Sequence, residues 1–467
     1  MLRLLSMTFI VVPWISLRSD GEELSKATVR RIETVAQAYV DGGAINSAAI
    51  GVIDGDQDAF IGVGRFSESD DRVPNAQTIY EIGSISKVFT GIMLADAIQN
   101  GLVTADQPVQ DLVPDDVRIP TWKNAPDRKI TLRDLSTHVS GLPRMPNNLN
   151  VLAQLSDPYA NYAASDLFTF LKAHQLRRSP GEKEEYSNLA VGLLGEVLSQ
   201  QQNLTYEALL RSRITEPLKM RDTCLSLSES QLERLAPPHN IGRKPSSNWN
   251  FKALAGAGAI RSSIGDMLKF CRANLNVPDN ETGKAISSAF SKQREAVGAS
   301  SRPMGFGWII NPGSETRWHN GGTGGYHSIL LINQKEKHCV VVLCNTASAE
   351  VDRLGSEIMT VLRGDDVKPK SFRKTIRVSK ETCAKYVGTY QFNPLVSMDV
   401  AADDEGTSLT VQLTGQEPLG IYPETETLWF LKAVKADVEF TVDEDSGQCT
   451  AATLFQNGIR QKAKKVK

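Results

Sequence analysis

Cysteine is scarce in this chain, and no charge of either sign is in marked excess. No two cysteines form a C-x-x-C pair, which argues against a zinc site, and a formal net charge of −2 gives no reason to expect nucleic acid or an anionic membrane as a partner. Buried free thiols are the expectation. Cys339 and Cys344 share one strand-like run and should face opposite sides of it, so only Cys383 and Cys449 are candidates for a disulfide. The six cysteines are Cys224, Cys271, Cys339, Cys344, Cys383 and Cys449.

A hydrophobic run long enough to cross a bilayer is also missing near the N-terminus. The apolar segment 4–17 is interrupted by Pro13 and is too short to span a membrane comfortably. It follows Arg3, as in a signal peptide, although no clean A-x-A cleavage site comes after it. We expect residues 1–20 to be a signal or leader segment, a disordered leader being the alternative. The mature protein is then periplasmic or secreted and has no transmembrane anchor.

The chain is nevertheless well supplied for folding and for chemistry. Its 467 residues predict two or three domains, and 41% hydrophobic residues suffice for a large core.

The stretch 81–90 contains Ser84 and Lys87 in the pattern S-x-x-K, followed by an apolar run typical of a buried helix that ends at Asn100-Gly101. Residues three apart share a helix face. Lys87 can therefore serve as the adjacent base that a serine nucleophile needs. Alone, the pattern is more typical of an ordinary helix start with a capping serine and a snorkelling lysine.

A second motif, Tyr186-Ser-Asn188, stands just before another predicted helix. Free tyrosine and lysine have pKa values of about 10 and 10.4. In a half-buried site, burial would lower the pKa of Lys87, and a nearby ammonium would lower that of Tyr186. The Asn188 amide can orient a substrate amide. The alternative is a packing tyrosine and a helix-capping asparagine.

A third motif, 318–326, reads W-H-N-G-G-T-G-G-Y and joins two predicted strands. Its glycines allow close backbone approach to a ligand, and an N–H there could meet the Ser84 N–H to form an oxyanion hole. A phosphate loop is excluded because G-x-x-x-x-G-K is absent. A plain hairpin turn remains the alternative.

The order of the predicted elements indicates an α/β fold. A helix over 21–41 and a hairpin over 47–63 come first, a long helical part covers about 79–290, and strands and a final helix follow over 305–362. The simplest architecture is one antiparallel sheet built from both ends of this region and flanked by helices, with a helical insert. His138, at the end of a short helix, is interpreted as a helix-end hydrogen bonder.

The C-terminal part has a different pattern. Residues 364–380 contain Pro369 and many charges and are predicted to be a linker, so that a chain ending near Arg363 should still fold. From residue 381 to 467, short strands alternate with regular turns, which predicts a small β-barrel domain. The lysine-rich end, 462–467, is expected to be a solvated tail.

Together, S-x-x-K, Y-x-N and H-N-G resemble the penicillin-recognising serine hydrolases. The similarity is to class C β-lactamases and their penicillin-binding, D-amino-peptidase and esterase relatives, and it spans about residues 25–363. The C-terminal part is similar to lipocalin-like domains appended to such enzymes. The resemblance implies a β-lactamase-like domain over 21–363 that acts on a small molecule or peptide without a cofactor or metal.

The resemblance also implies roles for the matched residues. Ser84 would be the acylated nucleophile, Lys87 its base and Tyr186 a proton relay. The implied substrate-binding residues are Asn188, His319, Asn320, Gly321 and Gly322, with the backbone N–H groups of Ser84 and Gly322 as the oxyanion hole.

One position departs from the pattern: lactamases usually have K-T-G where this chain has His319-Asn-Gly. An ordinary histidine pKa of about 6.5 predicts that carboxylate-bearing β-lactams bind better toward pH 6, as His319 protonates. The expected reaction is hydrolysis of β-lactam or D-amino-acid peptide amide bonds. The alternatives are a carboxylesterase of the same fold and a sensor that stays acylated.

Overall fold

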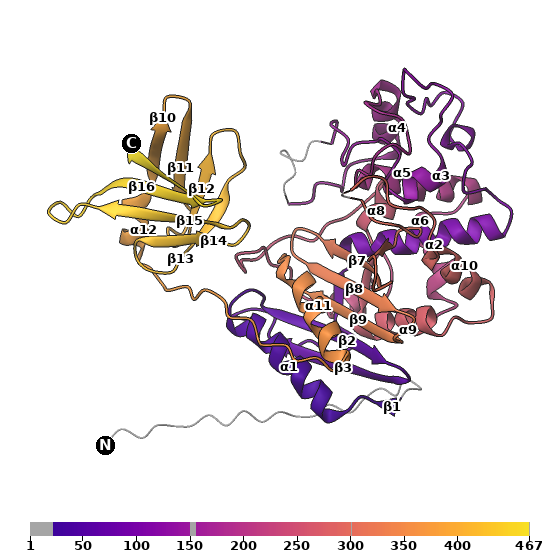
Figure 1. Ribbon diagram of the computed structural model, residues 1–467, viewed down its shortest axis with the longest axis horizontal. Helices are drawn as coiled ribbons and strands as arrows, with labels where there is room; N and C mark the ends of the chain where they lie inside the picture. Colours follow the sequence, from indigo (N-terminus) through magenta and orange to yellow (C-terminus); the bar gives the residue numbers. More distant parts are fainter. Residues whose placement is uncertain (1–21, 150–155, 300, 467) are drawn as a thin grey trace.

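An almost wholly antiparallel sheet joins strands from residues 22–64 with strands from residues 309–344 (Figure 1). The structure is a computed structural model that describes residues 22–149, 156–299 and 301–466, so the expected leader lies outside the described residues. The strand order is β1-β3-β2-β9-β8-β7-β6, and only β1 runs parallel to its neighbour. The bounds are β1 Glu22–Glu23, β2 Ser47–Asp54, β3 Gln57–Gly64, β6 Ile309–Ile310, β7 Arg317–Gly322, β8 His327–Asn333 and β9 His338–Cys344.

Strands β2 and β9 form the centre of the sheet and are buried along nearly their whole length. Side chains alternate between the two faces of a strand, and here both faces are covered. Ile50 of β2 belongs to one hydrophobic cluster and Ala49 to the other. Cys339 and Cys344 likewise lie in different clusters, as predicted. Cover on both faces explains why these strands read as almost continuous apolar runs.

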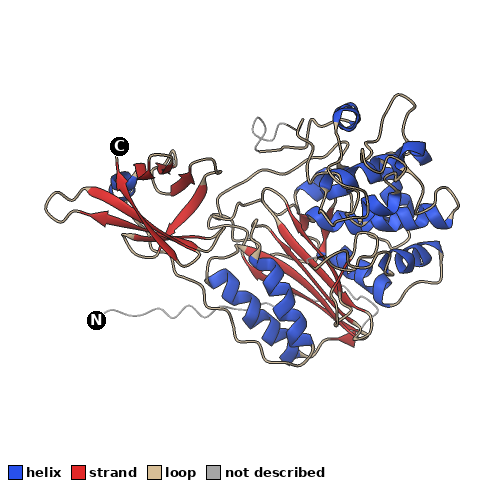
Figure 2. Ribbon diagram, turned by 45° about the horizontal axis from the view of Figure 1, so that its top comes forward, coloured by secondary structure: helices blue, strands red, loops and turns tan. Residues whose placement is uncertain are grey.

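Helices α1 (Lys26–Asp41) and α11 (Glu350–Leu362) lie together on one face of the sheet (Figure 2). The Ser25 hydroxyl caps α1 by accepting the N–H of Thr28. The Tyr39 hydroxyl of α1 donates to Glu357 of α11 at 2.8 Å. The first and last helices of this region therefore close the same layer.

The other face is covered by a helical region centred on α2 (Ser86–Gln99) (Figure 2). Helix α3 (Leu132–Ser136) begins with a capping box, in which the Thr131 hydroxyl accepts the N–H of Asp134 and the Asp134 carboxylate accepts the N–H of Thr131. The predicted stop after α2 is also present, because Asn100 is its C-cap and Gly101 has a φ of +69°. Two short strands, β4 Ile79–Glu81 and β5 Arg261–Ser263, pair within this region. The remaining helices are η1 Gly83–Ile85, η2 Val109–Leu112, α3 Leu132–Ser136, α4 Ala164–Ala173, α5 Asn188–Gln202, α6 Tyr206–Leu210, η4 Arg211–Thr215, α7 Glu229–Leu232, α8 Ala255–Gly258, α9 Ile264–Leu275 and α10 Glu281–Phe290.

The C-terminal part is a closed antiparallel barrel in which consecutive strands pair (Figure 1). Closure removes exposed sheet edges. The short helix α12 (Lys380–Tyr386) precedes it, and Trp429, Phe440 and Tyr386 fill its core. The strands are β10 Gly388–Asn393, β11 Val396–Ala402, β12 Leu409–Leu413, β13 Leu419–Pro423, β14 Leu428–Leu431, β15 Ala436–Val442, β16 Cys449–Gln456 and β17 Ile459–Lys465.

The segment expected to be a linker is packed against both parts of the chain. Phe372 lies against Gly42, and its ring centroid is 5.0 Å from that of Tyr39 in α1. The Ile376 N–H donates to Pro423 of the barrel. Barrel residue Lys432 donates to the Gly43 carbonyl at 3.0 Å. The barrel is therefore docked on the larger part of the molecule through defined contacts.

Two expectations about the C-terminal part need correction. Cys383 and Cys449 are both free, so this candidate pair forms no disulfide. The predicted solvated tail is wrong for residues 462–465, which belong to β17, where the small side chain of Ala463 faces the core between lysines. The α/β class and the added barrel are confirmed. Among the described residues, no helix is long and apolar enough to cross a membrane.

Candidate active site

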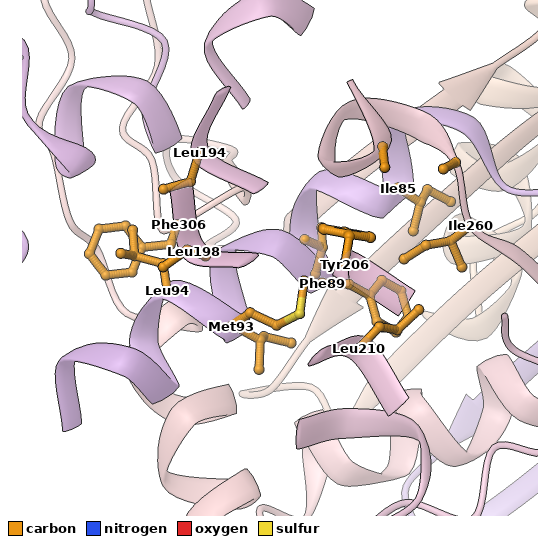
Figure 3. Close-up of a cluster of buried hydrophobic side chains, with 14 of the residues drawn as sticks. Ile85, Phe89, Met93, Leu94, Leu194, Leu198, Tyr206, Leu210, Ile260 and Phe306 are labelled. Carbon is orange, nitrogen blue, oxygen red and sulfur yellow. The ribbon is translucent and has the colours of Figure 1, made fainter. Parts of the chain in front are cut away.

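Ser84 lies in the one-turn helix η1, directly before the buried helix α2. All but the last two residues of α2 are buried, because its neighbours surround it. Figure 3 shows Phe89, Met93 and Leu94 of α2 packed among side chains of α5 and α6. A side chain on such a rigid element is held in a fixed position.

Lys87 is fully buried one turn after Ser84. Its Nζ lies within hydrogen-bond distance of Ser84 Oγ, at 2.9 Å, and donates to the carbonyl oxygen of Ala257 in α8 at 2.6 Å. Burial lowers the pKa of Lys87 well below 10.5, and the positive charge of Arg144 lowers it further. The amine is therefore biased toward its neutral form, which can accept a proton.

Tyr186 completes a compact group with these two residues. Lys87 Nζ is 4.9 Å from the centroid of the Tyr186 ring, and the phenol is hydrogen-bonded to Ser84. Burial raises the pKa of Tyr186, outweighing this hydrogen bond and the charge of Arg144. The expectation that a nearby ammonium lowers this pKa is wrong, because desolvation dominates and the phenol keeps its proton.

His138 is buried directly beside Tyr186, at a ring-centroid distance of 4.5 Å. Its Nδ1 accepts the N–H of Ser187 at 3.2 Å, and its carbonyl accepts the N–H of Glu185 at 2.8 Å. His138 thus holds the backbone on both sides of Tyr186. Burial lowers its pKa well below 6.5, so it stays neutral with Nδ1 as an acceptor. The sequence interpretation as a hydrogen bonder was correct, but it did not identify this partner.

Asn188, the first residue of α5, faces the loop that carries Met145. Its Nδ2 lies 3.4 Å from the Met145 sulfur, and its Oδ1 is buried without a hydrogen-bond partner. A buried amide oxygen without a partner is costly. Asn188 therefore retains an acceptor for an N–H donor that none of the described residues supplies.

Strand β7 places the H-N-G motif with alternating orientation. The His319 ring faces Tyr186, with a distance of 6.0 Å between the ring centroids. The Asn320 amide donates instead to Asp352 of α11 at 2.7 Å, on the opposite face of the sheet. Adjacent residues of a strand point to opposite faces, so the Asn320 side chain faces away from Tyr186, and the role of Asn320 in substrate binding stays a prediction.

The expected titration of His319 near pH 6 is also wrong. The side chain is fully buried, and its Nδ1 lies 2.6 Å from the carbonyl oxygen of Asn320. Burial, reinforced by the charge of Lys87, lowers the pKa of His319 to about 3. The ring is therefore neutral throughout the pH range in which carboxylate-bearing substrates would be tested.

Gly321 and Gly322, at the end of β7, lie against the turn that carries Ser84. Gly83 has a φ of +50°, and a Cβ there would be only 2.7 Å from the Gly322 nitrogen. A Cβ on Gly321 would be 2.0 Å from the Ile82 carbonyl oxygen. Only glycine permits this approach of two backbones. This approach brings the backbone N–H of Gly322 close to the turn that carries Ser84.

A loop over residues 237–249 supports the same hairpin from outside. The His239 N–H donates to Gly325 at 3.1 Å, and the Ser246 hydroxyl donates to Gly324 at 2.8 Å. The loop also contacts the barrel, through the ion pair of Lys244 with Asp403. Across the described segments, histidine, cysteine and acidic residues form no group of three or more that could hold a metal.

The sheet, the helical region and the Ser84–Lys87–Tyr186 group define the fold class of serine β-lactamases and penicillin-binding proteins. The chain belongs to the beta-lactamase family, whose family model matches residues 32–359. A second model, a domain of unknown function (DUF3471), matches residues 373–465, which include all eight barrel strands.

The chain is similar to several peptidases and penicillin-binding proteins. The chain is 26% identical to the D-alanyl-D-alanine-carboxypeptidase/endopeptidase AmpH of Escherichia coli K12, over 71% of this chain and 89% of that protein. It is 23% identical to penicillin-binding protein 4* of Bacillus subtilis, over 86% and 91% of the two chains. A solved β-lactamase/D-alanine carboxypeptidase from Yersinia pestis has the same fold, with a TM-score of 0.63, 24% identity, and coverage of 73% of this chain and all of that one.

Proposed function

We propose that this protein is a serine hydrolase that forms an acyl-enzyme on Ser84 and hydrolyses β-lactam or D-amino-acid peptide amide bonds. The observation that carries the proposal is the pairing of Ser84 Oγ with the fully buried Lys87 amine at 2.9 Å. A serine hydroxyl becomes an effective nucleophile when an adjacent base can take its proton. Burial supplies that base by favouring the neutral amine.

Acylation follows from the positions of the groups around Ser84. Lys87 accepts the hydroxyl proton as Oγ attacks the carbonyl carbon. The negative oxygen that develops is stabilised by the backbone N–H groups of Ser84 and Gly322, because fixed donors need little reorganisation. Tyr186, which remains protonated until this step, gives its proton to the leaving nitrogen and recovers from Lys87 the proton that Lys87 took from Ser84. Asn188 positions the substrate by accepting an N–H from it.

Deacylation uses the same groups in reverse. A water molecule takes the place of the leaving group and loses a proton to the Tyr186–Lys87 pair as it attacks the ester carbonyl. The oxyanion again meets the Ser84 and Gly322 N–H groups. The Ser84 oxygen then leaves and regains its proton from Lys87.

The names of the relatives support D-alanyl peptides and penicillins as the first substrates to test. A carboxylesterase is the main alternative, since neutral His319 gives the site no cation in place of the family lysine. A sensor that remains acylated is a further alternative.

Intact-protein mass spectrometry after mixing with a penicillin distinguishes these functions. A transient adduct on wild type, absent in Ser84→Ala, is the expected result. A lasting adduct would indicate a sensor. No adduct, together with Ser84-dependent cleavage of p-nitrophenyl esters, would indicate an esterase. Unchanged turnover in Ser84→Ala would place the chemistry elsewhere and refute the proposal.

We further propose the division into a β-lactamase-like domain over 21–363, a linker over 364–380 and a barrel domain over 381–467. The matched segments 32–359 and 373–465 support this division, with α12 starting at the edge of the linker, at Lys380. The apolar segment near the N-terminus supports a periplasmic or secreted location.

A further inference from the structure

The main chain at Arg144 is hydrogen-bonded to the residues that directly follow Tyr186, the proposed proton donor. The Arg144 carbonyl accepts the N–H groups of Asn188 and Leu189, at 3.0 and 3.3 Å. The preceding Pro143 carbonyl accepts the Ser187 hydroxyl at 2.7 Å. These three bonds anchor the main chain at Arg144 to the start of α5, so its side chain begins from a defined position at the site.

The Arg144 guanidinium lies over the Tyr186 ring, with its central carbon 5.0 Å from the ring centroid. In the proposed reaction, Tyr186 hands a proton to the leaving group. The guanidinium is therefore next to the place from which the leaving group departs. Its charge also acts on the reaction centre: after burial, it is the next cause of the lowered pKa of Lys87.

This guanidinium has unused hydrogen-bonding capacity. Arg144 is exposed, and within the described part of the chain its side chain forms no hydrogen bond or ion pair beyond the ring contact. A guanidinium carries five N–H donors in a planar fork that fits a carboxylate. An arginine held at a reactive site without an acidic partner is suited to bind an anion from outside the chain.

Four other basic side chains near the site are either engaged or uncharged. Lys87 is buried and bonded to Ser84 and Ala257, and His319 is neutral. Arg294 is paired with Glu184 at 2.5 Å, and Arg178 is paired with Glu185.

We propose that Arg144 binds a carboxylate carried by the leaving group, so that the preferred substrates release an amino acid with a free carboxylate. This inference rests on the proposed function, because it takes Ser84 as the nucleophile and Tyr186 as the donor to the leaving group. It favours removal of a C-terminal residue over cleavage of substrates with neutral leaving groups. Arg144 would supply the charge that His319 cannot.

The test compares paired substrates that differ only in this charge. One pair is an N-acylated D-alanyl-D-alanine peptide and its C-terminal amide. The other is benzoylglycyl-thioglycolate and its methyl ester, a more reactive pair that does not require a peptide. We expect wild type to prefer the acid in each pair, and Arg144→Met to lower kcat/KM for the acids about ten- to hundredfold while changing the neutral partners less than about threefold. Arg144→Lys should keep part of the preference, since it keeps the charge but loses the fork.

Arg302→Met is the matched control. Arg302 is also an exposed arginine over an aromatic ring, that of Trp318, but Trp318 belongs to the cluster on the other side of the sheet. This variant should leave the acid-to-neutral ratios of both pairs unchanged.

The outcomes separate this inference from the proposed function. Ser84-dependent turnover with an unchanged acid preference in Arg144→Met and Arg144→Lys would overturn the inference alone. Equal losses on acid and neutral partners would also overturn it, by showing that Arg144 only supports the fold of the site. If Ser84→Ala leaves turnover of every substrate unchanged, or wild type cleaves none of them, the proposed function and the inference fail together.

Discussion

At the scale of single residues, the ionisation of Lys87 links the chemistry to the stability of the fold. Its pKa in the folded chain is well below 10.5, and unfolding restores a value of about 10.4. Between these two values the unfolded chain binds more protons, so this group makes the free energy of unfolding rise with pH. We expect Lys87→Met to remove that part of the slope and abolish turnover. Urea unfolding of wild type and Lys87→Met from pH 7 to 10 measures the free energy of unfolding at each pH. Equal slopes of this free energy against pH in the two proteins would contradict a depressed pKa of Lys87.

A second residue-scale prediction concerns His138. Its φ is +59°, and its Nδ1 is the acceptor for the Ser187 N–H. His138→Ala leaves that buried N–H without a partner, at a cost of about 1–3 kcal/mol. Asparagine tolerates the left-handed conformation better and carries an acceptor oxygen. We expect His138→Ala to lower kcat by about tenfold or more with little change in KM, and His138→Asn to recover part of it. Equal kcat values in the two variants would refute this role.

How much of the site could be read from the sequence depends on how local each relation is. The closeness of Ser84 and Lys87 follows from helical spacing within one turn, and the structure shows it. The contacts of His138 and Arg144 with Tyr186 join loops about 45 residues apart, and no spacing rule predicts them. The ionisation of His319 depends on burial by the whole fold, which an isolated motif does not contain.

At the scale of elements, the fit between η1 and strand β7 yields a prediction about Gly83. An alanine there meets the Gly322 nitrogen at 2.7 Å and also adopts a φ of +50°. Gly101 has a φ of +69° but open space around it. Both alanine variants should therefore lose about 1 kcal/mol or more from backbone strain, whereas only Gly83→Ala should also lose most of its turnover. Melting temperatures and initial rates measure both effects, and full activity of Gly83→Ala would show that this contact does not set the site.

The elements were predicted well where pattern and burial agree. The buried helix after Ser84, the helix that begins at Asn188 and the central strands follow directly from apolar periodicity. The orientation of the Asn320 side chain could not be predicted, because a three-residue motif does not show which face of its strand each side chain takes. Strand β17 was missed because its outward lysines resemble a solvated tail. Only closure of the barrel supplies β10 and β16 as the neighbouring strands with which its backbone pairs.

At the scale of the whole molecule, the packed linker changes the expectation for truncated chains. A chain ending at residue 363 lacks Phe372, which covers Tyr39 and Gly42, whereas a chain ending at residue 379 keeps it. Both lack the barrel. The half-buried ring should make the longer chain more stable by about 1–2 kcal/mol. Denaturant unfolding of the two chains gives the difference, and equal stabilities would show that the linker packs only when the barrel is present.

The central pairing of β2 with β9 also has a consequence for biosynthesis. The Ser47 hydroxyl at the start of β2 donates to Asn345, a residue 298 positions later. During translation, β2 and β3 leave the ribosome long before β9 exists. The edge of β2 that pairs with β9 therefore has no partner strand during this interval. Ribosomes add about 5–20 residues per second, which leaves that edge unpaired for roughly 15–60 s. Such an interval favours engagement by a chaperone or an export machinery before the native sheet can form.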